Sequence, residues 1–461
     1  MRLKFINRER ELSRLSAFLG RKGRSLACLY GRRRCGKSRL IQQALIGKRA
    51  VYFVGDDRES PLQRRAVARE IARLMPGFDR VDYPGWDELL ERWFTSAPSG
   101  AALIIDELPA LVAAAPELPS LLQRHIDRPS KRSQPTILCG SSQRMMSGLL
   151  LDSTAPLYGR AQEILKLEPM QVSHLRDALS LRTSREAVES YAVWGGIPRY
   201  WELSLEHPNL SAAIAHLVLD PMGILHREPE RLLLDDLRDT TQASSVLSLI
   251  ASGCHRISEI GARLGRPATS LSRPLSRLIE LGLVTREFPA GSSARDSKRS
   301  FYRVHDPFLQ FWYRFVEPNR SRLEAGQLDL VQQDVMASWP EHLGQIWEQI
   351  ARAAMAHLKV DGIRWQPGSR WWGKNTDGRE IELDVVSLAD SHPDRAFVGE
   401  VKLQCAPREI PAILAELKRK ALTCPVLQGK KLACKLFVLK DSRQASSDGT
   451  IGPEAAVAAL G

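Results

Sequence analysis

The stretch Gly31-Arg32-Arg33-Arg34-Cys35-Gly36-Lys37-Ser38 decides the fold of the first part of this chain. It fits the pattern G-x-x-x-x-G-K-[ST] in full, and it stands between an apolar strand predicted over 25–30 and a helix. The glycines let the backbone wrap around a phosphate, so that successive N–H groups and the helix N-terminus face the anion. Lys37 would reach the β- and γ-phosphates and Ser38 would hold Mg²⁺. Residues 31–38 therefore predict a site for ATP and Mg²⁺.

Two further segments supply partners for this loop. Residues 101–106, AALIID, are continuously apolar up to the last position, which is typical of a strand buried on both faces. Asp106 would bind the Mg²⁺ shell and Glu107 would orient or deprotonate the attacking water. A second buried strand ends near Ser141 and Ser142, whose hydroxyls are candidates for the γ-phosphate or the water, or form a plain turn. Alternating strands and helices of this kind indicate a parallel α/β sheet.

Length and composition bound the remaining interpretation. The 461 residues predict about three domains. The net charge of +13 favours a polyanionic partner, with nucleic acid before membrane. No apolar run approaches the roughly 20 residues of a membrane helix, and the charged N-terminus lacks a signal-peptide core. Seven scattered cysteines without a C-x-x-C pair are no disulfide framework, and they favour a reducing cytoplasm.

Several motifs together resemble one family. The opening FINREREL at 5–12, the phosphate loop, LIIDE, LCGSS and PLYGR at 156–160 are similar to the prokaryotic, archaeal-type AAA+ ATPases, which are related to STAND and origin-recognition ATPases. The resemblance covers roughly residues 1–235. It implies a core of five parallel strands with a helical lid, and it leaves a homo-oligomer open.

The resemblance also implies roles for residues outside the loop. Asn7, Arg8 and Glu9 would lie beside the adenine. Arg160 resembles the family's arginine at the subunit or γ-phosphate side, and Arg199 in GGIPRY would be the sensor arginine of the lid. For both arginines the alternative is an ordinary surface residue.

A compact basic segment follows the lid. The pattern predicts three helices and then two strands, at 244–252, 257–264, 269–281, 283–288 and 301–304. This order is typical of a winged helix-turn-helix, which places its third helix in the DNA major groove. Between residues 256 and 303 there are ten Lys and Arg against four Asp and Glu, a net charge of +6. The segment therefore predicts a DNA partner, although such folds also dock proteins.

Individual side chains of this segment are assigned in the same way. The third helix carries Ser270, Ser272, Arg273, Ser276 and Arg277 as candidate contacts for phosphates or base edges, and the wing carries Arg295, Lys298 and Arg299. Pro274 falls inside the predicted third helix. A proline there requires either a kink or a later helix start.

The last part of the chain contains carboxylates on predicted strands. In 380–386 the period of two puts Glu380, Glu382 and Asp384 on one face, and in 398–403 it does the same for Glu400 and Lys402. Oxygen ligands from Asp384, Glu400 and the Val401 carbonyl would suit Mg²⁺, and Lys402 would activate water or stabilise the charge on an attacked phosphate. Glu348, on a preceding helix, would bind Mg²⁺ directly or through water.

This order of residues, with Trp371-Trp372-Gly373 before the first strand, resembles the PD-(D/E)xK nucleases, and the resemblance implies a restriction-endonuclease-like fold over about 306–440. The alternatives are a solvated strand face with an ion pair, or an inactive nuclease fold that only binds DNA.

The predicted fold class is α/β throughout. It comprises a P-loop AAA+ core at 1–168, a helical lid at 169–238, a winged helix at 239–305 and an α/β restriction-endonuclease-like domain at 306–461. The predicted function is an ATP-hydrolysing, DNA-associated protein with a Mg²⁺-dependent nuclease domain. Two hypotheses stay open beside it: a nucleotide-switched DNA-binding regulator, and a STAND-like signalling switch with an inactive nuclease fold.

Overall fold

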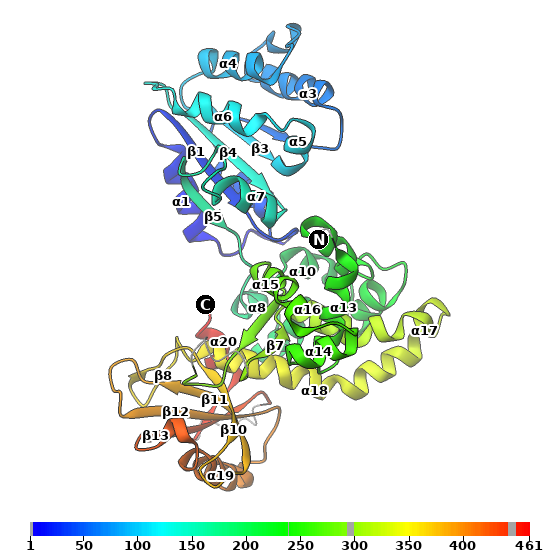
Figure 1. The fold of residues 1–461 in the computed structure, drawn as a ribbon, viewed down its shortest axis with the longest axis vertical. Helices are drawn as coiled ribbons and strands as arrows, with labels where there is room; N and C mark the ends of the chain where they lie inside the picture. Colours follow the sequence, from blue (N-terminus) through cyan, green and yellow to red (C-terminus); the bar gives the residue numbers. More distant parts are fainter. Residues whose placement is uncertain (1–2, 238, 293–298, 441–448) are drawn as a thin grey trace. The chain divides into compact units, whose positions relative to one another are not determined.

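The computed structural model describes residues 3–237, 239–292, 299–440 and 449–461 (Figure 1). The chain divides into two units. The N-terminal unit comprises Phe5–Pro169 and Leu234–Arg238, and the C-terminal unit comprises Met1–Lys4, Met170–Leu233 and Asp239–Gly461. No helix among the described residues is both long and apolar enough to cross a membrane.

The N-terminal unit is built on a parallel sheet with the strand order β2-β3-β4-β1-β5. Its strands are β1 (Arg24–Tyr30), β2 (Ala50–Val54), β3 (Ala102–Asp106), β4 (Gln134–Gly140) and β5 (Ala161–Lys166). All residues of the central strands β3 and β4 are buried, as their continuous apolar sequence predicts. The predicted α/β fold with five parallel strands is confirmed.

Seven helices of the described residues belong to this unit. They are α1 (Glu9–Leu19), α2 (Lys37–Ala44), α3 (Ser60–Ala72), α4 (Trp86–Ser96), α5 (Leu108–Ala114), α6 (Leu118–Asp127) and α7 (Gln143–Leu150). The aromatic residues of α4, among them Trp86, Trp93 and Phe94, are buried in the core on which β1 and β3 also pack.

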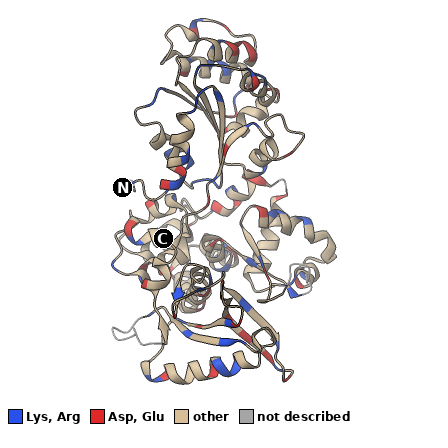
Figure 2. Ribbon diagram, turned by 90° about the vertical axis from the view of Figure 1, so that its left-hand side faces the viewer, with Lys and Arg blue, Asp and Glu red and all other residues tan. Residues whose placement is uncertain are grey.

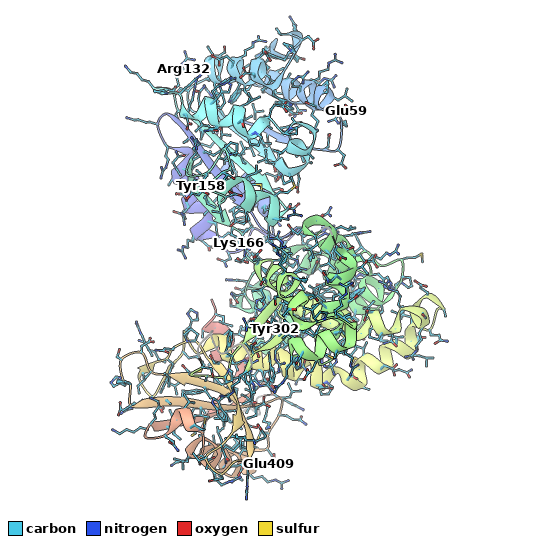
Figure 3. The ribbon with its side chains drawn as sticks, viewed as in Figure 1. Glu59, Arg132, Tyr158, Lys166, Tyr302 and Glu409 are labelled. Atoms are coloured by element: carbon cyan, nitrogen blue, oxygen red, sulfur yellow. The ribbon has the colours of Figure 1, made fainter. Side chains whose placement is uncertain are left out.

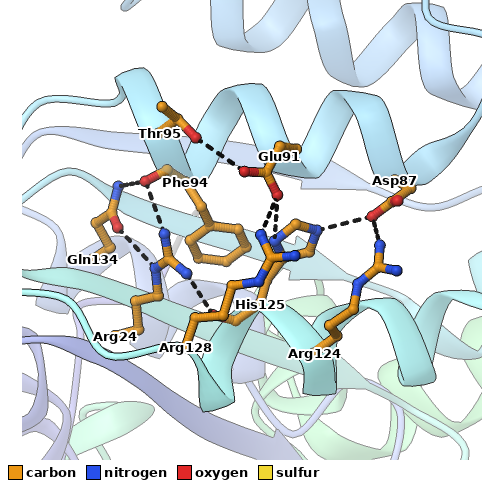
Figure 4. Close-up of polar contacts among 9 residues, drawn as sticks. All are labelled: Arg24, Asp87, Glu91, Phe94, Thr95, Arg124, His125, Arg128 and Gln134. Carbon is orange, nitrogen blue, oxygen red and sulfur yellow. Dashed lines mark hydrogen bonds and ion pairs between the residues drawn. The ribbon is translucent and has the colours of Figure 1, made fainter.

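A polar network ties α4 and α6 to the amino ends of β1 and β4 (Figure 4). Arg24 donates to the carbonyl of His125 at 2.8 Å, and Gln134 donates to the carbonyl of Phe94 at 2.9 Å. The fully buried His125 ring contacts Asp87 at 3.1 Å, and burial lowers the pKa of His125 to about 4. The ring is therefore neutral at pH 7. Hydrogen bonds and ion pairs between the helices hold this edge of the sheet.

The first part of the C-terminal unit is helical. Its elements are α8 (Leu175–Ala178), α9 (Ser184–Trp194), α10 (Pro198–Ser204), α11 (Leu210–Ile214) and the start of α12 (Glu228–Asp236), whose last residues are counted with the N-terminal unit.

The basic segment has the predicted order of helices and strands. It consists of α13 (Thr240–Ala251), α14 (Ile257–Leu264), α15 (Ser272–Glu280), β6 (Val284–Glu287) and the antiparallel β7 (Phe301–Val304). A 3₁₀ turn at Ala268–Leu271 precedes α15, so the later helix start is the outcome at Pro274. Pro274 lies in the first turn of α15, where its missing N–H removes no intrahelical bond. Arg295 and Lys298 lie outside the described residues.

The rest of the unit combines long helices with a mixed sheet. The helices are α16 (Pro307–Phe315), α17 (Arg320–Glu324), α18 (Leu328–Ala354), α19 (Ile410–Leu422) and α20 (Pro453–Ala458). The sheet order is β10 (Ser369–Lys374), β11 (Glu380–Leu388), β12 (Arg395–Lys402), β13 (Lys431–Val438) and β14 (Thr450–Ile451), with a separate hairpin of β8 (Lys359–Val360) and β9 (Ile363–Arg364). The three strands from β10 to β12 are antiparallel, whereas β12, β13 and β14 are parallel.

The hairpin of the basic segment contacts edge strand β10. Phe301 stacks on Trp372 with ring centroids 4.5 Å apart, and Arg299 donates to the Trp372 carbonyl at 3.0 Å. The Ala290 N–H donates to the Arg370 carbonyl at 2.9 Å. Arg299, predicted as a wing residue for DNA, therefore contacts the mixed sheet.

Candidate functional sites

The loop after β1 has the backbone that a phosphate cradle requires. Gly31 and Gly36 have φ of +147° and +93°, and a Cβ added at Gly31 would come within 2.4 Å of the Leu167 carbonyl oxygen. Both positions therefore favour glycine. Lys37, the first residue of α2, is buried, and its Nζ donates to the carbonyls of Gly31 at 2.9 Å and Arg32 at 3.1 Å. The ammonium group thus lies within the curve of the loop.

Asp106, at the carboxyl end of β3, lies beside this loop. Its carboxylate accepts a hydrogen bond from Ser38 Oγ at 2.7 Å and another from the Tyr52 hydroxyl. Burial by itself would raise the pKa of Asp106, but hydrogen bonds from Cys139, Tyr52 and Ser38 outweigh burial and lower the pKa. The hydroxyl and the carboxylate together form a hard-oxygen pair that fits Mg²⁺.

Tyr52 and Cys139 are absent from the sequence prediction. Tyr52 lies on β2 and Cys139 on β4, the two neighbours of β3 in the sheet. Each strand has an unremarkable apolar sequence, and the strand order is what brings these side chains to Asp106. The signal available beforehand was only that a polar hydroxyl interrupts the apolar segment AVYFV of β2.

Glu107 and Ser141 are also brought together. Glu107 has φ of +50°, and its Oε2 accepts hydrogen bonds from Ser141 Oγ at 3.0 Å and Ser141 N at 3.3 Å. Glu107 directly follows Asp106, so both carboxylates lie at the same edge of the sheet as the phosphate loop. This is the edge at which open α/β sheets bind their ligands.

The N-terminal segment reaches the same edge. Arg8 is buried and donates to the carbonyl of Glu168. Leu167, the residue before Glu168, donates its N–H to the carbonyl of the last residue of β1 at 2.7 Å. Asn7 has φ of +54° and Glu9 begins α1. Arg8, the middle one of the three predicted adenine-side residues, therefore contacts the segment that pairs with the end of β1, directly before the phosphate loop.

The two predicted arginines outside the loop lie elsewhere. Arg160 immediately precedes β5, at the amino edge of the sheet, and its Nε donates to both oxygens of Asp127 at 3.0 and 2.9 Å. Its guanidinium also donates to the carbonyl of Tyr158, which is labelled in Figure 3. Arg199 belongs to the C-terminal unit and pairs with Glu202 on α10 at 3.0 Å. The structure does not bring Arg160 to Lys37.

One further loop residue, Arg33, contacts the end of α12. Arg33 pairs with Asp235 at 3.6 Å, and Asp236 accepts hydrogen bonds from Ser142 Oγ at 3.1 Å and from the Arg144 N–H at 3.0 Å. Arg32 and Cys35 are buried and Arg34 has φ of +67°. The last turn of α12 is therefore bonded both to the phosphate loop and to the segment that carries Ser141.

A second group of polar residues lies on the mixed sheet of the C-terminal unit. Pairing between β11 and β12 ends at Val385 and Gly399, so the strands part at Asp384 and Glu400. Asp384 Oδ2 accepts the Val401 N–H at 2.9 Å. Lys402 Nζ donates to Glu400 Oε1 at 2.8 Å, which places both side chains on one face as the period of two predicts.

The backbone of Val401 is oriented toward Asp384. Leu439 N donates to the Lys402 carbonyl at 3.1 Å, so the backbone groups of Lys402 face β13. Because N–H and C=O alternate sides along a strand, those of Val401 face β11, where its N–H meets Asp384. Two carboxylates and one carbonyl thus border the same gap.

Glu348 completes the acidic group from α18. Arg352, one turn further along α18, donates to Glu348 at 3.2 Å and to the Asp384 carbonyl at 3.1 Å. Burial, followed by the charges of Glu348 and Glu400, raises the pKa of Asp384 to about 6. Burial likewise raises the pKa of Glu348, against the opposing effect of Arg352. Clustered carboxylates with raised pKa values are typical of a site that binds a cation.

The metal prediction for this site rests on the oxygen donors alone. Among the described residues, no three His, Cys, Asp or Glu side chains converge as a ready-made metal site. A site with two carboxylates and a backbone carbonyl needs no third side chain, and these donors fit Mg²⁺ in kind.

Two segments of the chain match protein-family models. Residues 5–203 match the model of a family described as an ATPase domain predominantly from Archaea, and residues 312–413 match a family described as archaeal and bacterial proteins of unknown function. An uncharacterized protein of Methanocaldococcus jannaschii is 28% identical over 458 residues, which cover 95% of this chain and 99% of that protein.

One solved structure is similar in fold, and the values for a second are given beside it. A Walker-type ATPase of Pyrococcus abyssi is 20% identical with a TM-score of 0.51, covering 67% of this chain and 96% of that one. The ORC2 protein of Aeropyrum pernix, in complexes with ADPNP and ADP, is 16% identical with a TM-score of 0.46, covering 73% and 97%. The chain thus has an α/β fold, with a five-stranded parallel sheet in a P-loop core and an α/β region after it.

Proposed function

We propose that the N-terminal unit hydrolyses ATP with Mg²⁺. The observation that carries this proposal is the bond of 2.7 Å between Ser38 Oγ and Asp106, beside the buried Lys37. Ser38 and Asp106 would hold the metal, which would neutralise charge on the β- and γ-phosphates. Lys37 would leave the loop carbonyls for the phosphates, and Glu107, held by Ser141, would orient the attacking water.

The end of α12 would carry the nucleotide state to the C-terminal unit. Asp235 contacts the phosphate loop through Arg33, and Asp236 contacts Ser142, next to the residue that holds Glu107. A change at the γ-phosphate would act on both contacts. Because α12 begins in the C-terminal unit, a shift of its last turn would act on that unit directly.

The basic segment would bind DNA through α15. Arg263, Arg266 and Arg273 are exposed, and so are Ser272 and Ser276 on α15. Figure 2 shows basic and acidic residues interspersed along both units, and within this segment Arg277 and Arg303 pair with glutamates. The exposed arginines are therefore the candidates for phosphate contacts.

The C-terminal unit would cleave a phosphodiester bond with Mg²⁺. Asp384, Glu400 and the Val401 carbonyl would hold the metal, which would polarise a phosphate oxygen. Lys402 would stabilise the charge that develops on the attacked phosphate, and Glu400 would position its ammonium group through the bond of 2.8 Å.

The test is cleavage of plasmid and linear DNA with Mg²⁺ or Mn²⁺. Asp384→Ala and Lys402→Ala should each reduce the rate at least 100-fold. Glu380→Ala is the matched control, because Glu380 is an exposed carboxylate on the same strand, β11. Cleavage that survives both substitutions would reject the assignment of this site.

A second candidate is a nucleotide-switched DNA-binding protein with an inactive nuclease-like fold, or a STAND-like switch with a protein partner. The observation that favours it is the lack of three converging metal-ligating side chains among the described residues. DNA affinity that falls steeply with salt, together with no cleavage in either metal, would support the DNA-binding form. A lack of DNA binding would support the protein-partner form.

A further inference from the structure

A polar cavity lies between the basic segment and helices α16 and α18 of the same unit. Its volume is about 280 Å³, and it is lined by the end of α13, by His255 and Arg303, and by residues of the two long helices. This volume is at the lower end of small-ligand sites, so it suits one nucleotide-sized group and excludes a duplex.

The lining combines Arg303, the ion pair of Arg314 with Glu341 at 2.6 Å, and neutral hydrogen-bonding groups. Arg303 is largely buried, lines the cavity and pairs with Glu287 through Nε at 3.0 Å. Gln345 and Gln349 lie one turn apart on α18 and both line the cavity. Amide side chains both donate and accept hydrogen bonds, which matches the edge of a nucleobase.

The cavity and the acidic group on the mixed sheet share one helix, α18. Gln345 and Gln349 flank Glu348 on α18. Helix α18 therefore contributes residues both to the cavity and to the acidic group.

We propose that this cavity binds one nucleotide, with its phosphate at Arg303 and its base against Gln345 and Gln349, and that this nucleotide belongs to the strand presented to Asp384 and Glu400. The second half of the proposal rests on the proposed nuclease function. A base held in such a cavity is unpaired, so the substrate is a single strand, an overhang or a splayed end. A free mononucleotide has the same chemistry, and the experiment separates the two sources.

The experiment is calorimetric titration of the full chain carrying Lys37→Ala, which removes the P-loop site from the measurement. The probes are the four deoxynucleoside 5′-monophosphates and a 5′-phosphorylated tetrathymidylate, each without metal. We expect the tetranucleotide to bind more tightly than the monophosphates. Arg303→Gln should weaken its binding at least tenfold and Gln349→Leu several-fold, whereas the exposed Arg227→Gln should leave it unchanged.

Each outcome bears on one half of the proposal. Binding of monophosphates without binding of the tetranucleotide would overturn the strand assignment. A lack of binding by every probe, or binding indifferent to both cavity variants, would overturn the cavity. Gln349→Leu decides the matter if Arg303→Gln unfolds, because Gln349 has no ion pair to lose. Asp384→Ala should abolish cleavage while keeping the binding, so failure of the nuclease proposal and failure of the cavity are distinguishable.

Discussion

Asp106 and Asp384 are both largely buried aspartates on sheets, yet their surroundings are opposite. Asp106 is surrounded by hydrogen-bond donors from Ser38, Tyr52 and Cys139, and its pKa is lowered. Asp384 is surrounded by other carboxylates, and its pKa is raised to about 6. The first carboxylate is stabilised as an anion by the protein itself. The second needs a proton or a cation to offset its neighbours.

This difference teaches how each site would respond to its ligand. At Asp106 the oriented hydroxyls already define where a metal and a phosphate would sit, so little rearrangement is needed. At Asp384 the metal would replace a proton, so binding is linked to pH. The groups around Asp106 are thus oriented before a ligand binds. At Asp384 the ligand itself would offset the repulsion between the carboxylates.

The largest effect is expected at the donor-rich site. Glu107→Gln keeps the shape of the residue that Ser141 holds but removes its charge, so ATP should still bind while turnover falls at least 100-fold. Steady-state hydrolysis and equilibrium ATP binding measure the two quantities separately. The exposed Glu117→Gln, at the start of α6, is the control and should keep full activity. Unaltered turnover in Glu107→Gln would reject its role.

The acidic site should bind metal in a pH-dependent way. Protonation of Asp384 competes with the cation, so Mn²⁺ affinity should fall about tenfold for each pH unit below about 6 and level off above it. Titration of the Asp106→Asn chain with Mn²⁺ between pH 5 and 8 measures this with the metal-binding carboxylate of the nucleotide site removed. Asp384→Asn should lose the dependence. An affinity that stays flat across this range in the parent would contradict the raised pKa.

The parts of each site that the sequence predicts are those that belong to one short motif or one strand. Lys37, Ser38 and Asp106 follow from a motif and from an apolar strand that ends in a carboxylate. Glu400 and Lys402 share a face because they are two residues apart on a strand.

The remaining contacts depend on which elements become neighbours. Tyr52 reaches Asp106 because β2 lies next to β3. The cavity at Arg303 is lined by four separate elements. None of these adjacencies has a local signal, so only the folded chain reveals them. The strand β13 and the helix α19 were likewise not predicted.

Stability should change in opposite directions at the two aspartates. The raised pKa of Asp384 means that the folded chain loses stability as pH rises from about 4 to about 6, and this loss persists above pH 6. Without metal at pH 7, Asp384→Asn should therefore raise the free energy of unfolding by roughly 1–3 kcal/mol, and near pH 4 it should have little effect. Asp106→Asn should destabilise at pH 7, because a lowered pKa contributes stability that is present above the unfolded value.

Urea unfolding in the presence of a chelator, at pH 7 and near pH 4, measures both variants. A shift of the urea midpoint in the same direction for both substitutions at pH 7 would contradict the opposite surroundings of the two aspartates. With added Mn²⁺ the parent chain should become more stable than Asp384→Asn, because the metal stabilises only the chain that binds it.

The smallest effect is expected for Tyr52→Phe. This change removes one of the donors to Asp106 and keeps the ring that fills the space beside β3. The pKa of Asp106 should rise, yet Ser38 and Cys139 still donate, so the carboxylate stays ionised at pH 7. Turnover of ATP should fall only two- to tenfold, with the loss concentrated at low pH. A pH profile of hydrolysis therefore separates a hydrogen-bond donor from a side chain that only packs. If activity falls at a higher pH on the acid side of the profile, Tyr52 acts as a donor. A uniform loss of activity at every pH would assign Tyr52 to packing.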